Sequence, residues 1–207
     1  PELREAICAK LKRDNGLDYI PAQIICSNGA KQSVGFSLLA MVNPGDEVII
    51  PAPYWVSYPA MTQLAQGIHV PVRTSFEHNY RLTPEQLEEA ITDKTRVLIL
   101  CSPSNPTGSC YSKQDLEGLA EVLRRYPNIS IISDEIYEYI VFDEEHICLL
   151  NVAPDLKDRV ALINGFSKGF AMTGWRLGYL AGPEELVKAV GKIQRQETSA
   201  PSSISQA

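Results

Sequence analysis

Short apolar runs alternate along this chain with segments in which apolar residues recur every third or fourth position. Seven of these runs are rich in Val and Ile and show little polar alternation, which favours strands that are buried on both faces. They occupy residues 23–27, 47–51, 68–72, 95–101, 129–133, 160–164 and 177–182. Helices are predicted between them, at residues 31–42, 55–66, 83–91, 112–126 and 183–195.

Two helix starts carry recognisable signals. Thr83 precedes Pro84 and Gln86, which predicts a helix with Thr as its N-cap and Pro in its first turn. In residues 1–13 apolar side chains recur every fourth position, which predicts an amphipathic helix with Pro1 in its first turn. Strands that alternate with helices in this way predict an α/β fold, with three α/β/α layers around a mainly parallel, seven-stranded sheet.

The composition is that of an ordinary globular protein. The chain has 207 residues, of which 44% are hydrophobic and 21% are charged, so one domain with a sizeable core is expected. The net charge of -6 argues against a nucleic-acid partner, which usually leaves a basic surface. The sequence shows neither an apolar stretch of membrane-spanning length nor a signal peptide, and its five cysteines lack the spacing of a metal site. We therefore expect no membrane, no metal, and a cytoplasmic protein with mostly buried, reduced cysteines.

Both ends of the sequence look interrupted. There is no initiator methionine, the predicted first helix begins at once, and the last residues, QETSAPSSISQA, contain no predicted helix or strand. We therefore expect the sequence to be a piece of a larger protein.

Several polar side chains directly follow predicted strands. In an open α/β sheet, ligands bind beyond the carboxyl ends of the strands, so residues at these ends are candidates for a site. The candidates are the turn at residues 28–31, Asn105, Asp134 with Tyr137, and Ser167 with Lys168. An amide, a carboxylate, a phenol and a lysine that meet at one edge of a sheet indicate an active site.

Most of these residues also have an ordinary structural explanation. Residues 29–30 fit a tight helix entry, and the sequence NPTG fits a turn. Asp134 could be the N-cap of a following helix, and Tyr137 and Trp55 could be core aromatic residues. Lys168 differs, because a lysine at a strand end between Ser, Gly and Phe is poorly explained as a solvated surface charge. One functional interpretation explains the whole set together.

Five motifs give the chain a resemblance to a known family. SNGAKQSV, PYWVSYP, SPSNPTG, SDEIYEYIVF and GFSKGFAMTGWRLGY resemble, in order and spacing, the large domain of fold-type I pyridoxal-phosphate-dependent aminotransferases of class I/II. The resemblance covers residues 1–207 and implies a pyridoxal-phosphate-binding large domain, with an N-terminal segment and a C-terminal small domain outside this range. It also implies amino acid and 2-oxo acid substrates and a homodimer.

The resemblance implies a role for each candidate residue. Lys168 matches the lysine that forms a Schiff base with the cofactor aldehyde and then moves the substrate proton. Its amine must be neutral, which an electropositive, partly desolvated site favours. Asp134 matches the carboxylate that pairs with the pyridine nitrogen, while Asn105 and Tyr137 match the hydrogen-bond donors to the ring's 3-oxygen. Trp55 matches the aromatic residue that stacks on the ring.

A second group matches the residues that bind the phosphate. Ser167 and Arg176 match side chains that hold it, and the arginine fork suits a phosphate because it donates two parallel hydrogen bonds. Gly29, Ala30 and Lys31 match the loop whose backbone amides and helix N-terminus hold the same group. Lys31 is expected to contribute its backbone.

The motifs are most similar to bacterial aspartate aminotransferases, from a branch that also includes aromatic-accepting relatives. Arg195 aligns with an arginine that binds the distal carboxylate in some aspartate enzymes, but an exposed arginine in the last turn of a helix is the simpler explanation. Residues 199–201 read Ser-Ala-Pro, which departs from the family's usual Ser-Asn-Pro in an interface loop.

Three alternatives stay open at this point. They are an aromatic or kynurenine-type aminotransferase, a carbon–sulfur lyase of the same fold, and a non-catalytic pyridoxal-phosphate-sensing domain of a regulator. We expect an aminotransferase with aspartate as the amino donor. Residues 1–207 alone should be inactive, because the resemblance places the arginine for the substrate α-carboxylate outside them.

Overall fold

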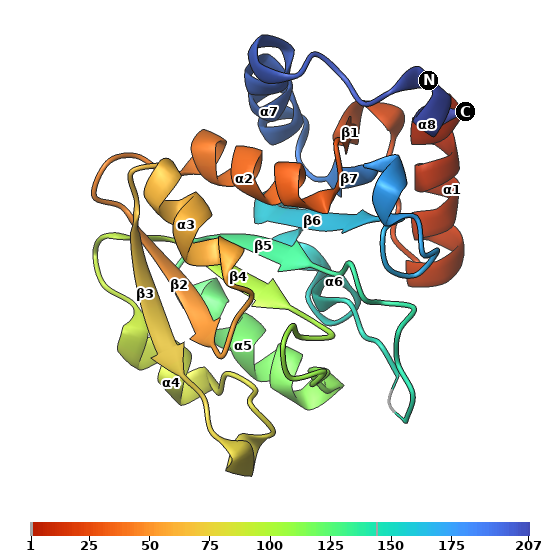
Figure 1. The fold of residues 1–207 in the computed structure, drawn as a ribbon. Coiled ribbons are helices and arrows are strands. Elements are labelled where there is room, and N and C mark those ends of the chain that lie inside the picture. The colour runs from red at the N-terminus through yellow and green to blue at the C-terminus, as the bar shows by residue number, and fades with distance from the viewer. Residues whose placement is uncertain (1, 144) are drawn as a thin grey trace.

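The fold is built around one seven-stranded sheet (Figure 1). The structure is a computed structural model that describes residues 2–143 and 145–207, so the expectation for Pro1 lies outside the described residues. All seven predicted strands are present: β1 Ile24–Ser27, β2 Glu47–Ala52, β3 Ile68–Arg73, β4 Thr95–Cys101, β5 Ser130–Asp134, β6 Val160–Gly165 and β7 Gly178–Ala181. Their order in the sheet is β1-β7-β6-β5-β4-β2-β3. Strand β7 runs antiparallel to both neighbours and the other described pairs are parallel, which confirms the mainly parallel sheet.

Helices cover both faces of the sheet, which confirms the three layers (Figure 1). One face carries α2 Ala30–Met41, α3 Ser57–Leu64 and α7 Glu184–Glu197. The other face carries α1 Glu2–Asn15, α4 Pro84–Ala90, α5 Lys113–Arg125 and α6 Leu149–Val152. Short 3₁₀ helices occupy Pro21–Gln23, Phe76–His78, Pro154–Arg159 and Thr173–Trp175.

Most helix boundaries lie close to the predicted ones. The Gln86 N–H donates to the Thr83 hydroxyl at 3.3 Å, and the Thr83 N–H donates to the Gln86 side-chain oxygen at 3.1 Å, which confirms that helix start. Helix α3 begins at Ser57, so Trp55 lies in a loop and not in the helix where we expected it. The four-residue helices α6 and α8, Ser203–Gln206, are absent from the prediction because so short a segment shows no helical period.

The central strands are buried on both faces, as their continuous apolar runs predict. Along β4, Val97 and Ile99 belong to the apolar cluster under α2 and α3, whereas Leu98 and Leu100 belong to the cluster under α5. Each of these four side chains is at most 3% exposed. Full burial of one such side chain stabilises the fold by roughly 1.5–3 kcal/mol, so the strand ends are a rigid support for the loops that follow them.

Two expectations about the environment can be compared with the structure. None of the helices among the described residues is long and apolar enough to cross a membrane. Cys26, Cys110 and Cys148 are buried, as expected of cysteines that act as small apolar side chains.

Candidate active site

A cavity of about 280 Å³ opens at the carboxyl ends of β1, β4, β5 and β6. Parallel strands bring these ends to one edge of the sheet, and the predicted residues meet there. Those that line the cavity are Ala30, Lys31, Trp55, Asn105, Asp134, Tyr137, Ser167, Lys168 and Arg176. Gly29 does not line it but lies against Arg176. The wall is completed by residues that the sequence analysis did not name: Tyr58, Cys101, Ile136 and Thr173.

Asp134 is the last residue of β5 and the buried acid of the cavity. It is 4% exposed, and its oxygens accept hydrogen bonds from the Tyr58 hydroxyl at 2.6 Å and from the Ile136 N–H at 3.3 Å. Burial raises the pKa of Asp134 to about 6, against the effect of these two hydrogen bonds. Residues 136–139 form a turn, so the explanation of Asp134 as a helix N-cap is wrong.

Tyr58 is one of the lining residues that were not predicted from the sequence. It is 2% exposed and makes an edge-to-face contact with Trp55, with 5.4 Å between the ring centroids. Burial, together with the neighbouring Asp134 carboxylate, raises the pKa of Tyr58 far above its ordinary value, so it remains a hydrogen-bond donor. The available signal was the spacing of three residues between the two aromatics in PYWVSYP, but the carboxylate that Tyr58 binds is 76 residues away in the sequence.

Asn105 and Tyr137 meet at the side of the cavity. Asn105 Nδ2 donates a hydrogen bond to the Tyr137 hydroxyl at 3.3 Å, so the structure brings together two residues predicted from different loops. Lys168 Nζ lies 5.7 Å from the centre of the Tyr137 ring. Lys168 itself is exposed, as are Gly169 and Phe170 beside it. Within residues 1–207 the lysine therefore sits on a surface turn at the open side of the cavity, although its sequence neighbours argued against a solvated surface position.

The turn between β1 and α2 forms another part of the cavity wall. Gly29 has a φ of 82°, and a Cβ atom there would lie 2.4 Å from Arg176 Nη2. The same Arg176 nitrogen donates to the Asn28 carbonyl at 3.2 Å. Gly178 permits a similar approach from β7, since its Cβ would lie 2.4 Å from the Ala30 nitrogen. The first N–H groups of α2 have no acceptor within the helix, which makes this turn a place where an anion can bind.

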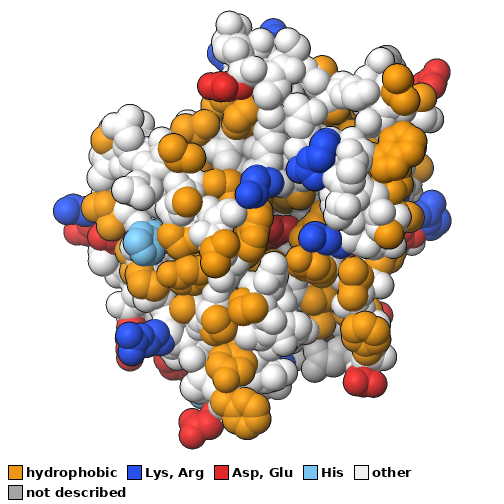
Figure 2. All heavy atoms as spheres, viewed as in Figure 1, with side chains coloured by type: hydrophobic (Ala, Val, Ile, Leu, Met, Phe, Trp, Pro, Cys, Tyr) orange, Lys and Arg blue, Asp and Glu red, His pale blue; other side chains and the backbone are white. Residues whose placement is uncertain are grey.

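Basic side chains surround the cavity. Figure 2 shows Lys and Arg side chains around a hollow on this face, with an acidic side chain inside it. The basic residues in the lining are Lys31, Lys168 and Arg176, and Ser167 is buried beside them. Lys31 Nζ lies 5.0 Å from the centre of the Trp55 ring. The side chain of Lys31 therefore lies at the site, in addition to the backbone contribution expected from the sequence. This charge pattern suits a ligand with anionic groups at its edge and a cationic atom at its buried end.

Comparison with known proteins identifies the family. Residues 1–207 match the family described as aminotransferase class I and II. The chain belongs to that family. A bifunctional aspartate aminotransferase and glutamate/aspartate-prephenate aminotransferase of Petunia hybrida is 55% identical over 205 residues, which are 99% of this chain and 43% of that protein. An aspartate/prephenate aminotransferase of Cereibacter sphaeroides is 53% identical over 207 residues, 100% of this chain and 52% of that protein.

Solved structures show the same fold for this aminotransferase-family chain. The crystal structure of an aspartate aminotransferase from Rhizobium meliloti has a TM-score of 0.98 and 47% identity, and the match covers 100% of this chain and 52% of that one. An aspartate aminotransferase from Thermus thermophilus with maleate has a TM-score of 0.95 and 42% identity, over 100% of this chain and 53% of that one. The chain thus spans about half the length of these relatives.

Arg195 does not belong to the cavity of this aminotransferase-family chain. It is exposed in the last turn of α7 and is not part of the lining. A cation near the C-terminus of a helix is favoured by the helix dipole, so the simpler explanation fits its position within residues 1–207.

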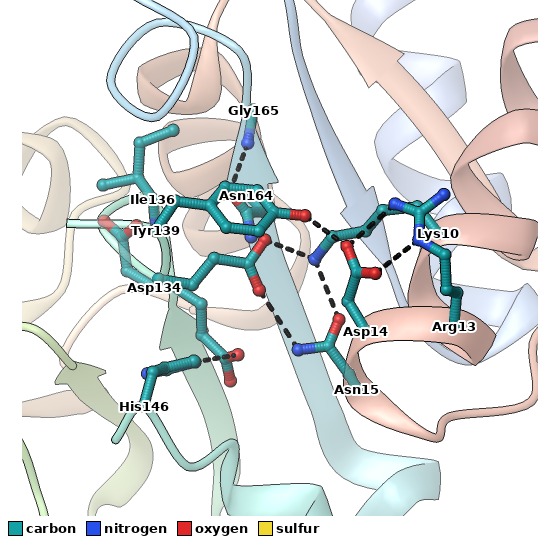
Figure 3. A network of polar contacts seen from close by, with 12 residues as sticks. Lys10, Arg13, Asp14, Asn15, Asp134, Ile136, Tyr139, His146, Asn164 and Gly165 are labelled. Atoms are coloured by element: carbon teal, nitrogen blue, oxygen red, sulfur yellow. Dashed lines mark hydrogen bonds and ion pairs between the residues drawn. The ribbon is translucent and has the colours of Figure 1, made fainter. Parts of the chain in front are cut away.

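A second buried polar cluster lies behind Asp134 (Figure 3). Glu135 is hydrogen-bonded to His146 Nε2 at 3.0 Å, and Glu138 forms an ion pair with Lys10 of α1. Ligand atoms of Glu135, Glu138 and His146 all lie within 4.8 Å of one another, but Lys10 already supplies a positive charge to this cluster. The arrangement ties the loop after β5 to α1.

Proposed function

We propose that the protein is a pyridoxal-phosphate-dependent aminotransferase that transfers the amino group of an amino acid, aspartate in particular, to a 2-oxo acid. The observation that carries the proposal is the cavity itself. Its lining combines a buried carboxylate, Asp134, a turn beside Arg176 that is suited to an anion, and the exposed Lys168. Membership of the class I and II aminotransferases and the names of the similar proteins support the same function.

The residues present fit pyridoxal phosphate. Asp134 is buried and forms no ion pair with any described residue, and a protonated pyridine nitrogen would supply the missing positive charge. Arg176, Ser167 and the first N–H groups of α2 offer donors to a phosphate, and the absence of a Cβ at Gly29 lets the guanidinium lie directly against that turn. Trp55 lies in the wall of the cavity, where its side chain offers a surface on which an aromatic ring can stack.

The residues divide the work of the reaction among them. When bound, the cofactor supplies an aldehyde that takes up the amino group and a ring that withdraws electrons from the substrate Cα. Asp134 would hold a proton on the ring nitrogen, and Asn105 and Tyr137 would hold the ring's 3-oxygen by hydrogen bonds. Lys168 Nζ would hold the cofactor covalently through its aldehyde carbon at rest and would be released when the substrate amine takes its place. The freed Lys168 amine would then move the proton from the substrate Cα.

An acidic substrate is supported by the charge of the rim. Arg176 is directed to the phosphate-binding turn, whereas Lys31 remains beside Trp55 and can pair with a second carboxylate. The similar proteins are named for aspartate and prephenate, which both carry two carboxylates. We propose a dicarboxylic substrate of this kind, processed by a homodimer.

Completion of the site from outside residues 1–207 is also proposed. Lys168 is exposed here, although a working site must orient the substrate and keep water away from it. Orientation alone can lower a barrier by roughly 7–11 kcal/mol, so residues 1–207 alone should fold but not transaminate. The measurement is a transamination assay on residues 1–207 beside the full-length protein, with 2-oxoglutarate as acceptor. Comparable turnover by the two proteins would show that the remaining segments are dispensable.

Covalent attachment at Lys168 provides the direct test of the proposed function. Borohydride reduction of the full-length protein loaded with pyridoxal phosphate should fix the cofactor on the peptide that contains Lys168. Lys168→Ala should leave no label, and recovery of the label on Lys31 or Lys188 would contradict the assignment. Aspartate should then yield an oxo acid and a transferred amino group. Pyruvate with ammonia would identify a lyase, and tight cofactor binding without turnover of any amino acid would identify a sensor.

A further inference from the structure

Two glutamines connect the phosphate-binding turn to the end of α7. Gln194 is 6% exposed, and its Nε2 donates to the Cys26 carbonyl at 2.8 Å and to Gln32 Oε1 at 3.2 Å. The same Gln32 oxygen accepts a hydrogen bond from the Asn28 N–H at 2.9 Å. Gln32 Nε2 donates to the Thr198 hydroxyl at 3.0 Å. The Gln32 amide therefore bridges the turn on one side and the residue that follows α7 on the other.

These contacts fix the peptide groups on both sides of Asn28. Its N–H is held by Gln32, and its carbonyl accepts a hydrogen bond from Arg176. Gly29, the next residue, is the N-cap of α2 and offers no side-chain cap of its own. Glycine is free to adopt many conformations, so the surrounding hydrogen bonds select the one observed. A rotation at this point would change the direction of the first N–H groups of α2, whose residues Ala30 and Lys31 line the cavity.

We propose that Gln32 and Gln194 are positioning residues that hold the turn at residues 28–31 in the orientation that receives the cofactor phosphate. The inference rests on the proposed function, since the phosphate is that of pyridoxal phosphate. Neither glutamine lines the cavity, so both act through the turn. Through the hydrogen bonds of these two glutamines, the C-terminal end of α7 also supports the site. Arg195, in the same turn of that helix, is exposed.

The test compares pyridoxal 5′-phosphate with pyridoxal, which lacks the phosphate, as ligands of the cofactor-free full-length protein. Gln194→Met keeps the approximate volume but removes the donor, and Gln32→Met removes the acceptor of the Asn28 N–H. Each variant should weaken binding of pyridoxal phosphate about tenfold, because a buried polar group is left without its partner. Binding of pyridoxal should change less than about twofold, because it does not use the turn. In the double variant the loss of affinity for pyridoxal phosphate should stay well below the product of the losses in the two single variants. Both substitutions release the same turn, and it can be released only once.

Gln196→Met is the matched control, because Gln196 lies on the same helix and is exposed. It should bind both ligands as the unmodified protein does. Equal weakening of both ligands in the Gln32 and Gln194 variants would indicate a general structural role and overturn the proposal, as would unchanged binding of both. If Gln194→Met does not fold, Gln32→Met tests the proposal with the same two ligands. Gln32 is only half-buried, so its substitution should disturb folding less. An unmodified protein that binds no pyridoxal phosphate would instead refute the proposed function, and the inference with it.

Discussion

Two buried carboxylates follow one another at the end of β5, and their surroundings differ. Asp134 lines the cavity and accepts a hydrogen bond from Tyr58, and burial raises its pKa to about 6. Glu135 is hydrogen-bonded to His146 on the other side. Burial pushes the pKa of Glu135 upward, but the hydrogen bond and charge interaction with His146, together with hydrogen bonds from Cys148 and Ser133, outweigh burial and bring that pKa below its ordinary value. Successive residues of a strand point to opposite faces. Asp134 therefore faces the cavity, whereas Glu135, the next residue, faces the buried polar cluster behind it.

The contrast extends to the residues around each carboxylate. Behind the sheet edge, Glu138 accepts hydrogen bonds from Lys10 and from Asn15 Nδ2, the latter at 3.1 Å, so its charge is paired (Figure 3). In front, Asp134 lines the cavity and forms no ion pair with any of the described residues. A buried charge without a partner is costly, so such a residue persists where a ligand supplies the partner. Substitutions in front should therefore change activity, and substitutions behind should change stability.

The largest effect is expected for Asp134→Asn. The amide fills the same space but cannot hold a proton on the ring nitrogen, so kcat of the full-length protein should fall about a thousandfold, or about 4 kcal/mol of transition-state stabilisation. Cofactor binding should persist, as measured by absorbance after gel filtration. Near-normal turnover would place Asp134 with the structural residues behind it and remove the contrast.

Lys10→Met should act on the other cluster and in the other way. The side chains of Lys10 and Glu138 are 15% and 4% exposed, so loss of the lysine leaves a buried carboxylate with Asn15 as its remaining partner. The free energy of unfolding should fall by about 3–4 kcal/mol in urea titrations, while kcat of the folded protein stays within about twofold. Lys10→Met combined with Glu138→Leu should recover most of that stability, because no unpaired charge remains. A large fall in kcat with unchanged stability would reverse the assignment of this cluster.

The pH dependence of stability should also reveal the unpaired carboxylate. The folded pKa of Asp134, about 6, lies above its ordinary value of 3.8, so the folded state binds the proton more tightly than the unfolded state does. Stability of the cofactor-free protein is therefore lost as pH rises from about 4 to about 6, by at most about 3 kcal/mol. Asp134→Asn should remove this loss, so the variant should gain stability relative to the unmodified protein above pH 6 and not at pH 4. Parallel stability curves for the two proteins across this range would argue against a destabilised carboxylate.

The features that the sequence predicted are those with a local cause. Continuous apolar runs located all seven strands, and the strand ends located Asp134 and Asn105 at one edge of the sheet. The hydrogen bond of Tyr58 could not be predicted, because it joins residues 76 positions apart and depends on how α3 packs over the sheet. The exposure of Lys168 was missed for a related reason. Its sequence neighbours do not reveal whether a turn lies under other parts of the molecule or on its surface.

The smallest effect that still distinguishes Asp134 and its partners from the buried polar cluster behind them is expected for Tyr58→Phe. Phenylalanine keeps the ring contact with Trp55 but removes the hydroxyl that donates to Asp134 at 2.6 Å. Without this donor the pKa of Asp134 should rise further, and its carboxylate should hold the ring nitrogen's proton less effectively. We expect kcat to fall about tenfold at neutral pH, or about 1.4 kcal/mol, with the acid limb of the rate profile displaced to higher pH. Tyr126→Phe, at the end of α5 and outside the cavity, is the control and should leave the profile unchanged. A fall in kcat that is equal at every pH would mean that Tyr58 acts through packing, whereas a displaced acid limb would identify its hydroxyl as the group that keeps Asp134 ionised.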